Sequence, residues 1–343
     1  MKLEVGPFAA DAEEWDSFGA AQHGWTHFHH YGWKRVMESV LGHECRYLAA
    51  RDRAGHLIGI LPLVHVRSLA FGRYLMSMPF VNYGGPVGSD EAIRSLVDEA
   101  RAVAAGDHAK LLELRSAVEL PITLPVSHRK VTVVLPLPAG DPDAAWKALG
   151  TKLRAQVKRP EKEGVTVRFG ADQVDAFFAV FSRHMRDLGT PTQPRALFRA
   201  IAEAFGDDVW FGCAYLEDRP IAAGCGFRWG GEFEMTWASA LIEFNRTAPN
   251  MALYWALIRR AAETGLHRFN FGRCTPGSGT HRFKRQWGAV DEPLWWYQYA
   301  PAGRAAATPS PDDGAYSWGP RVWKRLPVAL ATALGPRIVR GIP

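Results

Sequence analysis

The sequence predicts an α/β fold, in the α+β sense, made of two copies of one unit, each with a mixed central sheet. Two segments have the pattern of a turn followed by an apolar strand: residues 55–63 and residues 218–226. Each segment is followed by a second strand, an amphipathic helix and a third strand. The spacing also repeats, because 53 residues separate Gly59 from Leu112 and 48 separate Ala222 from Asn270. Repeated order and spacing together indicate a tandem duplication.

The first copy continues with three elements after its opening strand. A strand is expected to end near residues 82–85, where Asn-Tyr-Gly-Gly favours a turn. An amphipathic helix is expected over about residues 91–104, and the apolar stretch at residues 110–115 predicts the strand that follows it.

The second copy has the same three elements with clearer boundaries. Pro249 and Asn250 open a helix whose apolar residues recur at three- to four-residue spacing, and Gly265 closes it. Residues 268–272 alternate polar and apolar positions as a strand does, and the Gly- and Ser-rich residues 273–280 must leave the sheet as a loop. Four side chains are therefore expected at one end of this sheet: Asn270, Arg273, Lys284 and Trp287.

Length and composition fit two domains of ordinary size. The chain has 343 residues, of which 47% are hydrophobic, so each domain can bury its own core. Pro138 and Pro142 mark the junction between the copies. We expect a first domain at residues 1–140, a second domain with the main site at 141–300, and a linker with a basic tail at 301–343.

Four short motifs carry a resemblance to a known family. They are residues 184–191 (His-Met-Arg-Asp-Leu-Gly-Thr-Pro), Pro249-Asn250 with Tyr254-Trp255, Phe271-Gly272-Arg273, and Phe283-Lys284 with Trp287-Gly288. Over about residues 1–300 the chain resembles the FemAB-like proteins of the GNAT superfamily, most closely the branch associated with exosortase and PEP-CTERM exopolysaccharide loci. Two positions depart from the family, which usually has Asp at position 270 and Ser at position 274, where this chain has Asn270 and Cys274.

The resemblance implies two GNAT-like folds in tandem and an N-acyltransferase. Such an enzyme moves an aminoacyl group from aminoacyl-tRNA, or an acyl group, onto an amine of a nucleotide- or lipid-linked envelope precursor of peptidoglycan or exopolysaccharide. Two alternatives remain open. One is a transferase that uses acyl-coenzyme A or an acyl-carrier protein in exopolysaccharide synthesis. The other is a non-catalytic binding module of a polysaccharide machine, which Asn270 favours if the family's Asp is needed for activity.

The acyl donor must already be activated, because the chain has no Walker loop and no dinucleotide fingerprint. A coenzyme A enzyme of the GNAT type normally has a glycine-rich turn before the helix that binds the pyrophosphate. Residues 246–250 read Arg-Thr-Ala-Pro-Asn, where glycine is missing and Pro249 lacks an N–H. We therefore expect no tightly bound cofactor, and an aminoacyl-tRNA or an acyl thioester as co-substrate.

The expected reaction is attack of a neutral amine on the carbonyl carbon of that ester or thioester. Asn250 and backbone N–H groups near the strand at residues 223–226 are candidates to hold the oxyanion. The base that takes the amine proton is Glu234, His184 or a carboxylate of the substrate, and the sequence does not choose among them. Tyr254 either returns a proton to the leaving group or is a core tyrosine on the apolar face of its helix.

Substrate-binding candidates come from both copies. Cationic Arg273 and Lys284 suit phosphates or carboxylates, and Trp287 follows them. Arg154 and Lys158 share the face of a basic helix that either grips phosphates, including those of a tRNA, or is simply solvated. The remaining candidates are Asn82 and Tyr83, at the place in the first copy that matches the donor turn, and Arg186, in a motif shared with the family.

No metal centre is expected. The run His27-Phe28-His29-His30 has no Glu or Cys at ligand spacing, and its aromatic neighbours indicate a helix entering a core. The four cysteines form no Cys-x-x-Cys pair. No stretch of eighteen apolar residues exists and the first residues lack a secretory signal, so we expect a cytoplasmic protein, with possible peripheral contact at the inner face of the membrane.

The C-terminal tail carries most of the positive charge. Residues 314–343 contain five basic residues and no Asp or Glu, against a net charge of +6 for the whole chain. Apolar residues are interleaved with the basic ones, so the tail either lies on an anionic membrane surface or folds back on the second domain. Pro327 and Pro336 are expected to break any long helix, and residues 303–314 have the composition of a linker.

Overall fold

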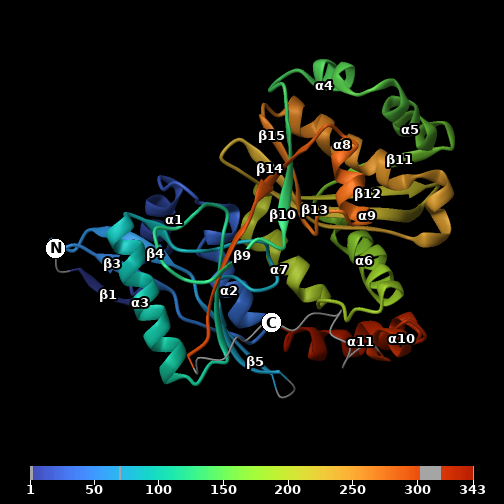
Figure 1. Ribbon diagram of the computed structural model, residues 1–343. Helices are drawn as coiled ribbons and strands as arrows, with labels where there is room; N and C mark the ends of the chain where they lie inside the picture. Colours follow the sequence, from blue (N-terminus) through green and yellow to red (C-terminus); the bar gives the residue numbers. More distant parts are fainter. Residues whose placement is uncertain (1–2, 69–70, 302–317, 343) are drawn as a thin grey trace. The chain divides into compact units, whose positions relative to one another are not determined.

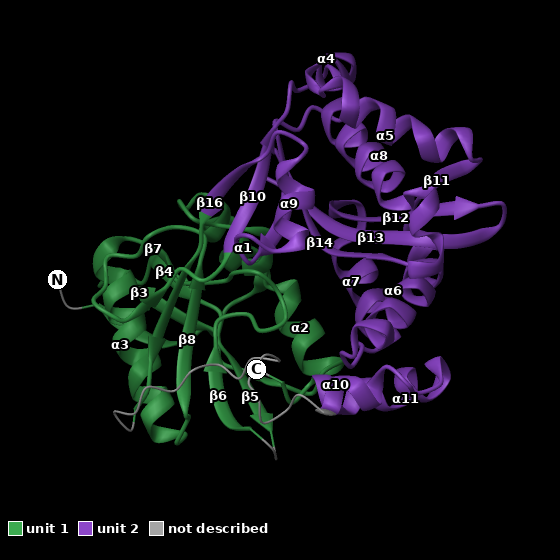
Figure 2. Cartoon of the chain, turned by 45° about the vertical axis from the view of Figure 1, so that its right-hand side comes forward, with its two compact units in different colours: residues 1–130, 293–313, 340–343 green, residues 131–292, 314–339 purple. Residues whose placement is uncertain are grey.

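The computed structural model describes residues 3–68, 71–301 and 318–342, and Figure 1 shows the course of the chain. The chain divides into two compact units, coloured separately in Figure 2. Unit 1 comprises residues 1–130, 293–313 and 340–343, and unit 2 comprises residues 131–292 and 314–339. The predicted α/β class is confirmed, because each unit combines helices with a mixed sheet. The predicted domain boundaries at residues 140 and 300 stay a prediction.

Unit 1 contains a four-stranded sheet of order β1-β3-β4-β7 and a six-stranded sheet of order β2-β5-β6-β8-β17-β9. Its strands are β1 (Glu4–Pro7), β2 (Glu44–Cys45), β3 (Leu48–Arg51), β4 (Leu57–Leu61), β5 (Val64–Ser68), β6 (Gly72–Met76), β7 (Val87–Gly88), β8 (Leu111–Ser116), β9 (Val126–Ser127) and β17 (Trp295–Tyr299). Its helices are α1 (Ala12–Ala20), the 3-10 turn η1 (His27–His29), α2 (Gly32–Ser39) and α3 (Asp90–Gly106).

Helix α3 forms where the sequence predicts it. The Ser89 side chain caps it by accepting a hydrogen bond from Ala92 N, and Asp90 and Glu91 lie in the first turn, where negative charge suits the helix dipole. Its apolar face, which includes Leu96, is buried against β3 and β4. The strand expected before this helix is present as β6, but its predicted end near residues 82–85 is wrong, because β6 ends at Met76 and the chain then takes positive φ angles at Met78 and Phe80.

Unit 2 has one seven-stranded sheet of order β11-β12-β13-β14-β15-β10-β16. Its strands are β10 (Val131–Pro136), β11 (Val165–Phe169), β12 (Val209–Leu216), β13 (Arg219–Trp229), β14 (Glu232–Ala240), β15 (Arg268–Cys274) and β16 (Val290–Pro293). Its helices are α4 (Pro142–Ala148), α5 (Thr151–Lys162), α6 (Val174–Leu188), α7 (Arg195–Phe205), α8 (Pro249–Glu263), α9 (Gly279–Arg285), α10 (Trp318–Trp323) and α11 (Val328–Val339), with short 3-10 turns η2 (Ala171–Gln173), η3 (Gly206–Asp208) and η4 (Ile242–Thr247). Helices α8 and α6 cover opposite faces of the sheet, as Figure 1 shows.

The two units share one strand arrangement, which confirms the predicted duplication. Strands β6 and β8 in unit 1, and β14 and β15 in unit 2, run parallel, and a helix connects each pair. Next to β8 lies antiparallel β17, and next to β15 lies antiparallel β10. Strand β10 comes directly after unit 1 in sequence, and β17 comes directly after unit 2. Each sheet is therefore completed by a strand that follows the other unit along the chain.

Helix α8 confirms the boundaries predicted from its sequence. It begins at Pro249, whose missing N–H costs nothing in the first turn. Ala248 before it has φ +50°, a left-handed conformation that turns the chain sharply into the helix. Gly265 after it has φ +80°, which glycine adopts without strain. The predicted strand at residues 268–272 is also present, as β15.

The described part of the tail folds back on unit 2. Helices α10 and α11 both contact α6, and Arg186 Nη1 donates a hydrogen bond of 2.9 Å to Leu326 O, between the two helices. Pro327 separates the helices as predicted, but α11 continues through Pro336, so the predicted break there is wrong. The predicted linker at residues 303–314 lies outside the described residues. Among the described helices, none is long and apolar enough to cross a bilayer.

Candidate functional site

The sheet of unit 2 opens between its two parallel strands. Strands β14 and β15 pair at three positions only, from Glu232 with Arg268 to Glu234 with Asn270. Beyond them β14 continues beside β13, and β15 continues beside β10. The two strands that α8 connects therefore separate. Within the described residues, the β14 backbone beyond Glu234 has no strand on its β15 side.

A bulge and two unpaired hydroxyls mark the same stretch of β14. Cys225 faces Trp237 and Gly226 faces Met235, so Thr236 is an extra residue in the ladder. Within the described residues, Thr236 Oγ1 and Ser239 Oγ are buried without a hydrogen-bond partner. Buried polar groups normally have partners, so these hydroxyls suit a bound ligand. Neither hydroxyl could be recognised from the sequence, because a bulge is not visible in the alternation of a single strand.

The oxyanion donors predicted near residues 223–226 cannot come from that strand itself. Strand β13 is flanked by β12 on one side and β14 on the other, so the sheet occupies its backbone N–H groups. The backbone N–H groups of β14 that lie beyond Glu234 and face the opening are better placed to donate hydrogen bonds to an oxyanion. The sequence pattern could not reveal this, because it identifies strands and does not say which neighbours they have.

Lys284 is buried beside the opening, although it is a charged residue near the end of a short helix. Only 4% of it is exposed. Its Nζ donates hydrogen bonds to Gly272 O (2.7 Å) and Arg273 O (2.9 Å), at the end of β15. Burial lowers its pKa to about 8, against the opposing influence of the Cys274 thiol and the Glu234 carboxylate, while the charge of Arg273 lowers it further. Arg273 and Lys284 therefore lie together at one end of the sheet, as predicted.

Asn270 is the centre of a buried hydrogen-bond network. Its Oδ1 accepts hydrogen bonds from the Thr132 hydroxyl and from Gly272 N, and its Nδ2 donates to Glu232 Oε1 at 2.9 Å. An aspartate at this position would have no N–H for Glu232 and would set two carboxylates against each other. Asn270 can therefore donate a hydrogen bond to Glu232, which an aspartate could not do. Thr132 and Glu232 could not be recognised as its partners from the sequence, because β10 and β14 meet β15 only in the folded sheet.

Tyr254 and Trp287 belong to an aromatic cluster under α8. The Tyr254 ring stacks on Phe271 at 5.5 Å, and Phe283 and Trp287 lie 5.0 and 6.4 Å from it. Burial raises the pKa of Tyr254, so its hydroxyl keeps its proton at neutral pH. The cluster fixes α9, and with it Lys284, against α8 and β15. Asn250 lies one helical turn before Tyr254 and is half-buried.

His184 and Arg186 on α6 lie away from this cluster. His184 Nδ1 is 3.0 Å from Ala240 O, at the far end of β14, roughly 20 Å along the strand from Glu234. Burial lowers the pKa of His184. Arg186 forms an ion pair with Asp187 at 2.8 Å in addition to its bond to the tail. Glu234, which is fully buried at the opening, is therefore the better placed of the two predicted bases.

The remaining substrate-binding candidates are spread over both units. In unit 2, Arg154 on α5 is half-buried, whereas Lys158 is exposed with its Nζ 5.7 Å from the centre of the Trp146 ring. In unit 1, Asn82 and Tyr83 are both buried, and the Tyr83 ring lies 5.7 Å from that of Phe28. Their roles toward a substrate stay predictions.

The histidine run in unit 1 is a packing element. His29 Nδ1 lies 3.0 Å from both Thr26 N and Thr26 Oγ1, and His29 Nε2 lies 2.8 Å from Gly85 O. Burial lowers the pKa of His29 to about 4, so the ring is neutral. Over the described residues, no three His, Cys, Asp or Glu side chains come together in a way that could hold a metal ion.

Comparison with known proteins identifies the domain that carries the site. Residues 149–285, from α5 to α9, match the acetyltransferase (GNAT) domain family. The tandem GNAT-like fold is thus confirmed in its second copy by sequence, and the chain is an acyltransferase. This outcome goes against the alternative of a non-catalytic binding module. No curated protein matches the chain.

Solved structures show the same fold over most of the chain. The crystal structure of FemX covers 87% of this chain and 97% of its own length, with a TM-score of 0.63 and 16% sequence identity. The structure of L-PGS from Bacillus licheniformis has a TM-score of 0.55 and 13% sequence identity, and the match covers 85% of this chain and 96% of that one. A tandem GNAT protein from the clavulanic acid biosynthesis pathway has a TM-score of 0.53 and 12% sequence identity, and the match covers 89% of this chain and 100% of that one.

Proposed function

We propose that the chain transfers an aminoacyl or acyl group from an ester or thioester donor to an amine of a cell-envelope precursor. One observation carries the proposal. A buried lysine with a lowered pKa and a buried glutamate lie together where β14 and β15 separate beside α8. An ionisable group with a perturbed pKa, such as this lysine, is typical of functional sites.

The reaction assigns a role to each group at the opening. The neutral amine of the acceptor attacks the carbonyl carbon of the donor, so a C–N bond forms and the C–O or C–S bond to the leaving group breaks. Glu234 takes the proton that the amine loses, and Tyr254, which stays protonated at neutral pH, returns one to the leaving atom. Backbone N–H groups of β14 stabilise the oxyanion, with Asn250 as a further donor from the start of α8.

Lys284 supplies a positive charge for a carboxylate or phosphate of the substrate. Two of its three N–H groups are held by backbone carbonyls, which leaves one for a ligand. The side chain is thereby fixed in position before the substrate arrives, so little entropy is lost on binding. Arg273, half-buried beside it, adds a second cation for the same group.

An aminoacyl ester of tRNA is the proposed donor. Pro249 begins α8 without an N–H and no glycine lies in residues 246–250, so the turn is poorly suited to a pyrophosphate. The likeness to FemX supports the same choice, and the basic residues Arg154 and Lys158 suit a tRNA. The GNAT domain match favours the second candidate, an acyl-coenzyme A donor.

Titration with coenzyme A separates the two donors. We expect no heat of binding for coenzyme A or acetyl-coenzyme A at sub-millimolar concentration in isothermal titration calorimetry, because the start of α8 offers too few N–H groups to phosphate. A micromolar dissociation constant, equivalent to about 8 kcal/mol, would contradict the tRNA donor and favour acyl-coenzyme A.

The proposed acceptor is a peptidoglycan or exopolysaccharide precursor carried on a nucleotide or a lipid. The relatives named FemX and L-PGS support an acceptor of the envelope. The exosortase and PEP-CTERM branch, to which the four motifs point, is the more specific form of this proposal. A lipid carrier would bring the substrate to the inner face of the membrane.

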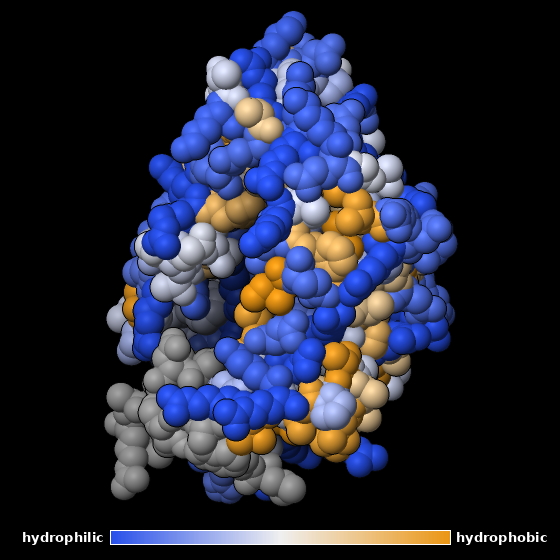
Figure 3. Space-filling model, turned by 90° about the vertical axis from the view of Figure 1, so that its right-hand side faces the viewer, coloured by the Kyte–Doolittle hydropathy of each residue, from blue (hydrophilic) through white to orange (hydrophobic). Residues whose placement is uncertain are grey.

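The tail is the proposed membrane contact. Helix α11 turns Ala331, Gly335 and Val339 inward, where they are buried, and it exposes Leu330, Leu334 and Ile338 along its outer side. Lys324, Arg325 and Arg337 are exposed beside them. In the lower part of Figure 3, where α10 and α11 lie, orange apolar surface alternates with blue polar surface. Apolar and basic side chains on one exposed face suit an anionic bilayer.

Vesicle sedimentation tests this contact. The protein is expected to sediment with phosphatidylglycerol vesicles at low salt and to dissociate as ionic strength rises, since the Debye length falls to about 8 Å near physiological salt. Leu330→Asn combined with Leu334→Asn should abolish binding without unfolding, because both side chains are exposed. Equal sedimentation of the variant, or equal binding to neutral phosphatidylcholine, would rule out the proposed contact.

A further inference from the structure

A cavity of about 470 Å³ opens in unit 2, at the opposite end of α8 from the proposed active site. It lies between the end of β11, the start of β12, the end of β13 and the last turn of α8. Arg260, which lines it, is roughly 16 Å along the helix from Pro249. The volume is typical of sites for small organic ligands. Nothing in the proposed transfer reaction uses this cavity.

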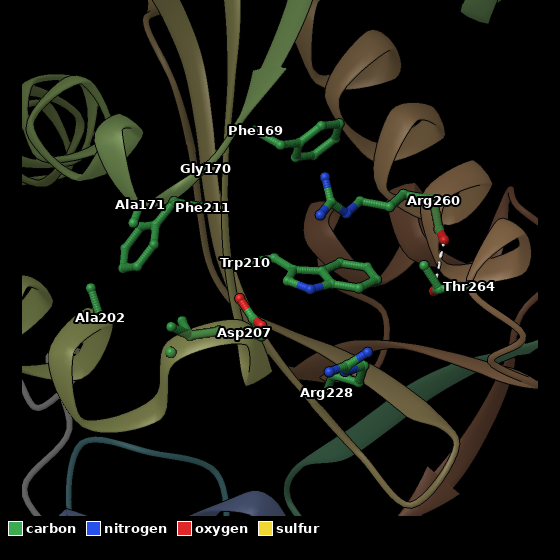
Figure 4. Close-up of a pocket in the computed structure, with 12 residues that line it drawn as sticks. Phe169, Gly170, Ala171, Ala202, Asp207, Trp210, Phe211, Arg228, Arg260 and Thr264 are labelled. Carbon is green, nitrogen blue, oxygen red and sulfur yellow. Dashed lines mark hydrogen bonds between the residues drawn. The ribbon is translucent and has the colours of Figure 1, made fainter.

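Arg260 is held in this cavity by two aromatic rings. Its Cζ lies 4.8 Å from the centre of the Trp210 ring and 5.0 Å from the centre of the Phe169 ring. Trp210 is in turn stacked on Phe233 at 4.7 Å, so it cannot easily move away. Figure 4 shows the guanidinium nitrogens of Arg260 between the rings of Phe169 and Trp210. The rings fix the plane of the guanidinium and shield it from water.

The donors of this guanidinium are not used within the described part of the chain. Its Nε is buried and has no hydrogen-bond partner there, and the side chain forms no ion pair there. Leaving a buried donor without a partner is unfavourable, so a ligand that accepted a hydrogen bond from it would bind more tightly. A guanidinium has five N–H donors and no acceptor, and its planar edge matches the two oxygens of an oxyanion.

The charges around the cavity favour an oxyanion with a single negative charge. Arg228 also lines the cavity, but its Nη2 lies 3.2 Å from Asp208 Oδ1, so its charge is largely balanced. Asp207 at the rim is exposed and would repel a highly charged ligand. Among the described residues that line the cavity, Arg260 is therefore the one cation without an ion pair, which suits a carboxylate better than a phosphate dianion.

The part of the cavity next to Arg260 is walled by the aromatic rings of Phe169 and Trp210. Ala171, Ala202 and Phe211 line the part on the other face of the sheet (Figure 4). A ligand with a carboxylate at Arg260 would therefore carry an apolar body. We infer that this cavity is a binding site for a small aliphatic or aromatic carboxylic acid, held by the edge of Arg260 and separate from the site of acyl transfer.

Calorimetric titration of the full chain tests the inference. The probes are phenylacetate, indole-3-acetate and octanoate, with phenylacetamide as an uncharged counterpart of the first. At least one carboxylate is expected to bind, and Arg260→Met should weaken it about tenfold or more, the loss typical of a buried charge-assisted hydrogen bond. Phenylacetamide should bind weakly to both proteins. The matched control is Arg259→Met, which removes an exposed arginine paired with Glu263 at 2.7 Å and should leave the affinity unchanged.

A second variant keeps the test valid if Arg260→Met disturbs folding. Thr264→Leu enlarges an exposed side chain in the cavity wall on the same side as Arg260 and keeps the guanidinium, and it should also weaken carboxylate binding. Binding by none of the three carboxylates up to millimolar concentration overturns the inference. So does equal affinity of the wild type and of the folded Arg260 and Thr264 variants.

Discussion

Replacing Lys284 with methionine is expected to lower turnover about tenfold or more, with little change in the melting temperature. Methionine has a similar length but no charge, so the substrate loses its cation. Fold stability should change little, because losing the hydrogen bonds to Gly272 O and Arg273 O is offset by no longer burying an ammonium group. Arg285→Met is the matched control. It removes an exposed arginine of the same helix, 3.6 Å from Asp291, and should leave turnover unchanged.

The pH dependence distinguishes a binding cation from a structural one. With a pKa of about 8, Lys284 loses its charge above that pH, so kcat/KM of the wild type should fall in the alkaline range. The Lys284→Met variant should not show this alkaline decrease in kcat/KM. Stability should change the other way, because between pH 8 and the ordinary lysine pKa the unfolded chain binds more protons, so folding becomes more favourable as pH rises. A large loss of melting temperature with intact activity of the folded fraction would make Lys284 structural.

Replacing Trp287 with alanine is expected to destabilise unit 2 by about 3 to 5 kcal/mol. The side chain is 3% exposed and lies against Tyr254, Phe271 and Phe283, with ring centres 6.3 to 6.4 Å apart. Removing the indole leaves a cavity where α9 meets α8, so Lys284 would also lose its fixed position. The measurement is chemical denaturation monitored by circular dichroism.

Trp287→Phe is the control for this cavity, because it keeps a ring in the cluster. It should cost clearly less stability than the alanine variant. A loss below about 1 kcal/mol for Trp287→Ala would mean that the aromatic cluster does not hold α9 in place.

The local elements of unit 2 could be predicted because their signals lie within a few residues. Pro249 and Gly265 mark the two ends of α8, and the alternation of residues 268–272 marks β15. The duplication could also be predicted, since the order of the strands and helix, and the spacing between them, repeat in the two halves of the chain. Both conclusions rest on patterns along the chain.

The partners of those elements could not be predicted, because they depend on contacts between distant residues. Val131 to Pro136 has a strand pattern, but nothing in it indicates pairing with β15 at positions 268–274. The bonds of Asn270 to Thr132 and Glu232 follow from that pairing, so its role in the network was hidden too. Burial of Lys284 is a further case, because a lysine at the end of a short helix is usually exposed.

The central claim is that unit 2 forms an amide at the opening between β14 and β15. The most direct measurement is mass spectrometry of an amine-bearing, uridine diphosphate-linked muramyl peptide incubated with the protein and a mixture of aminoacyl-tRNAs. We expect the peptide to gain the mass of one amino acid residue with the wild type and Arg285→Met, and far less with Lys284→Met or Glu234→Gln. An equal gain with all four proteins would contradict the assignment of the site, and a gain only when acetyl-coenzyme A replaces the tRNA would contradict the proposed donor.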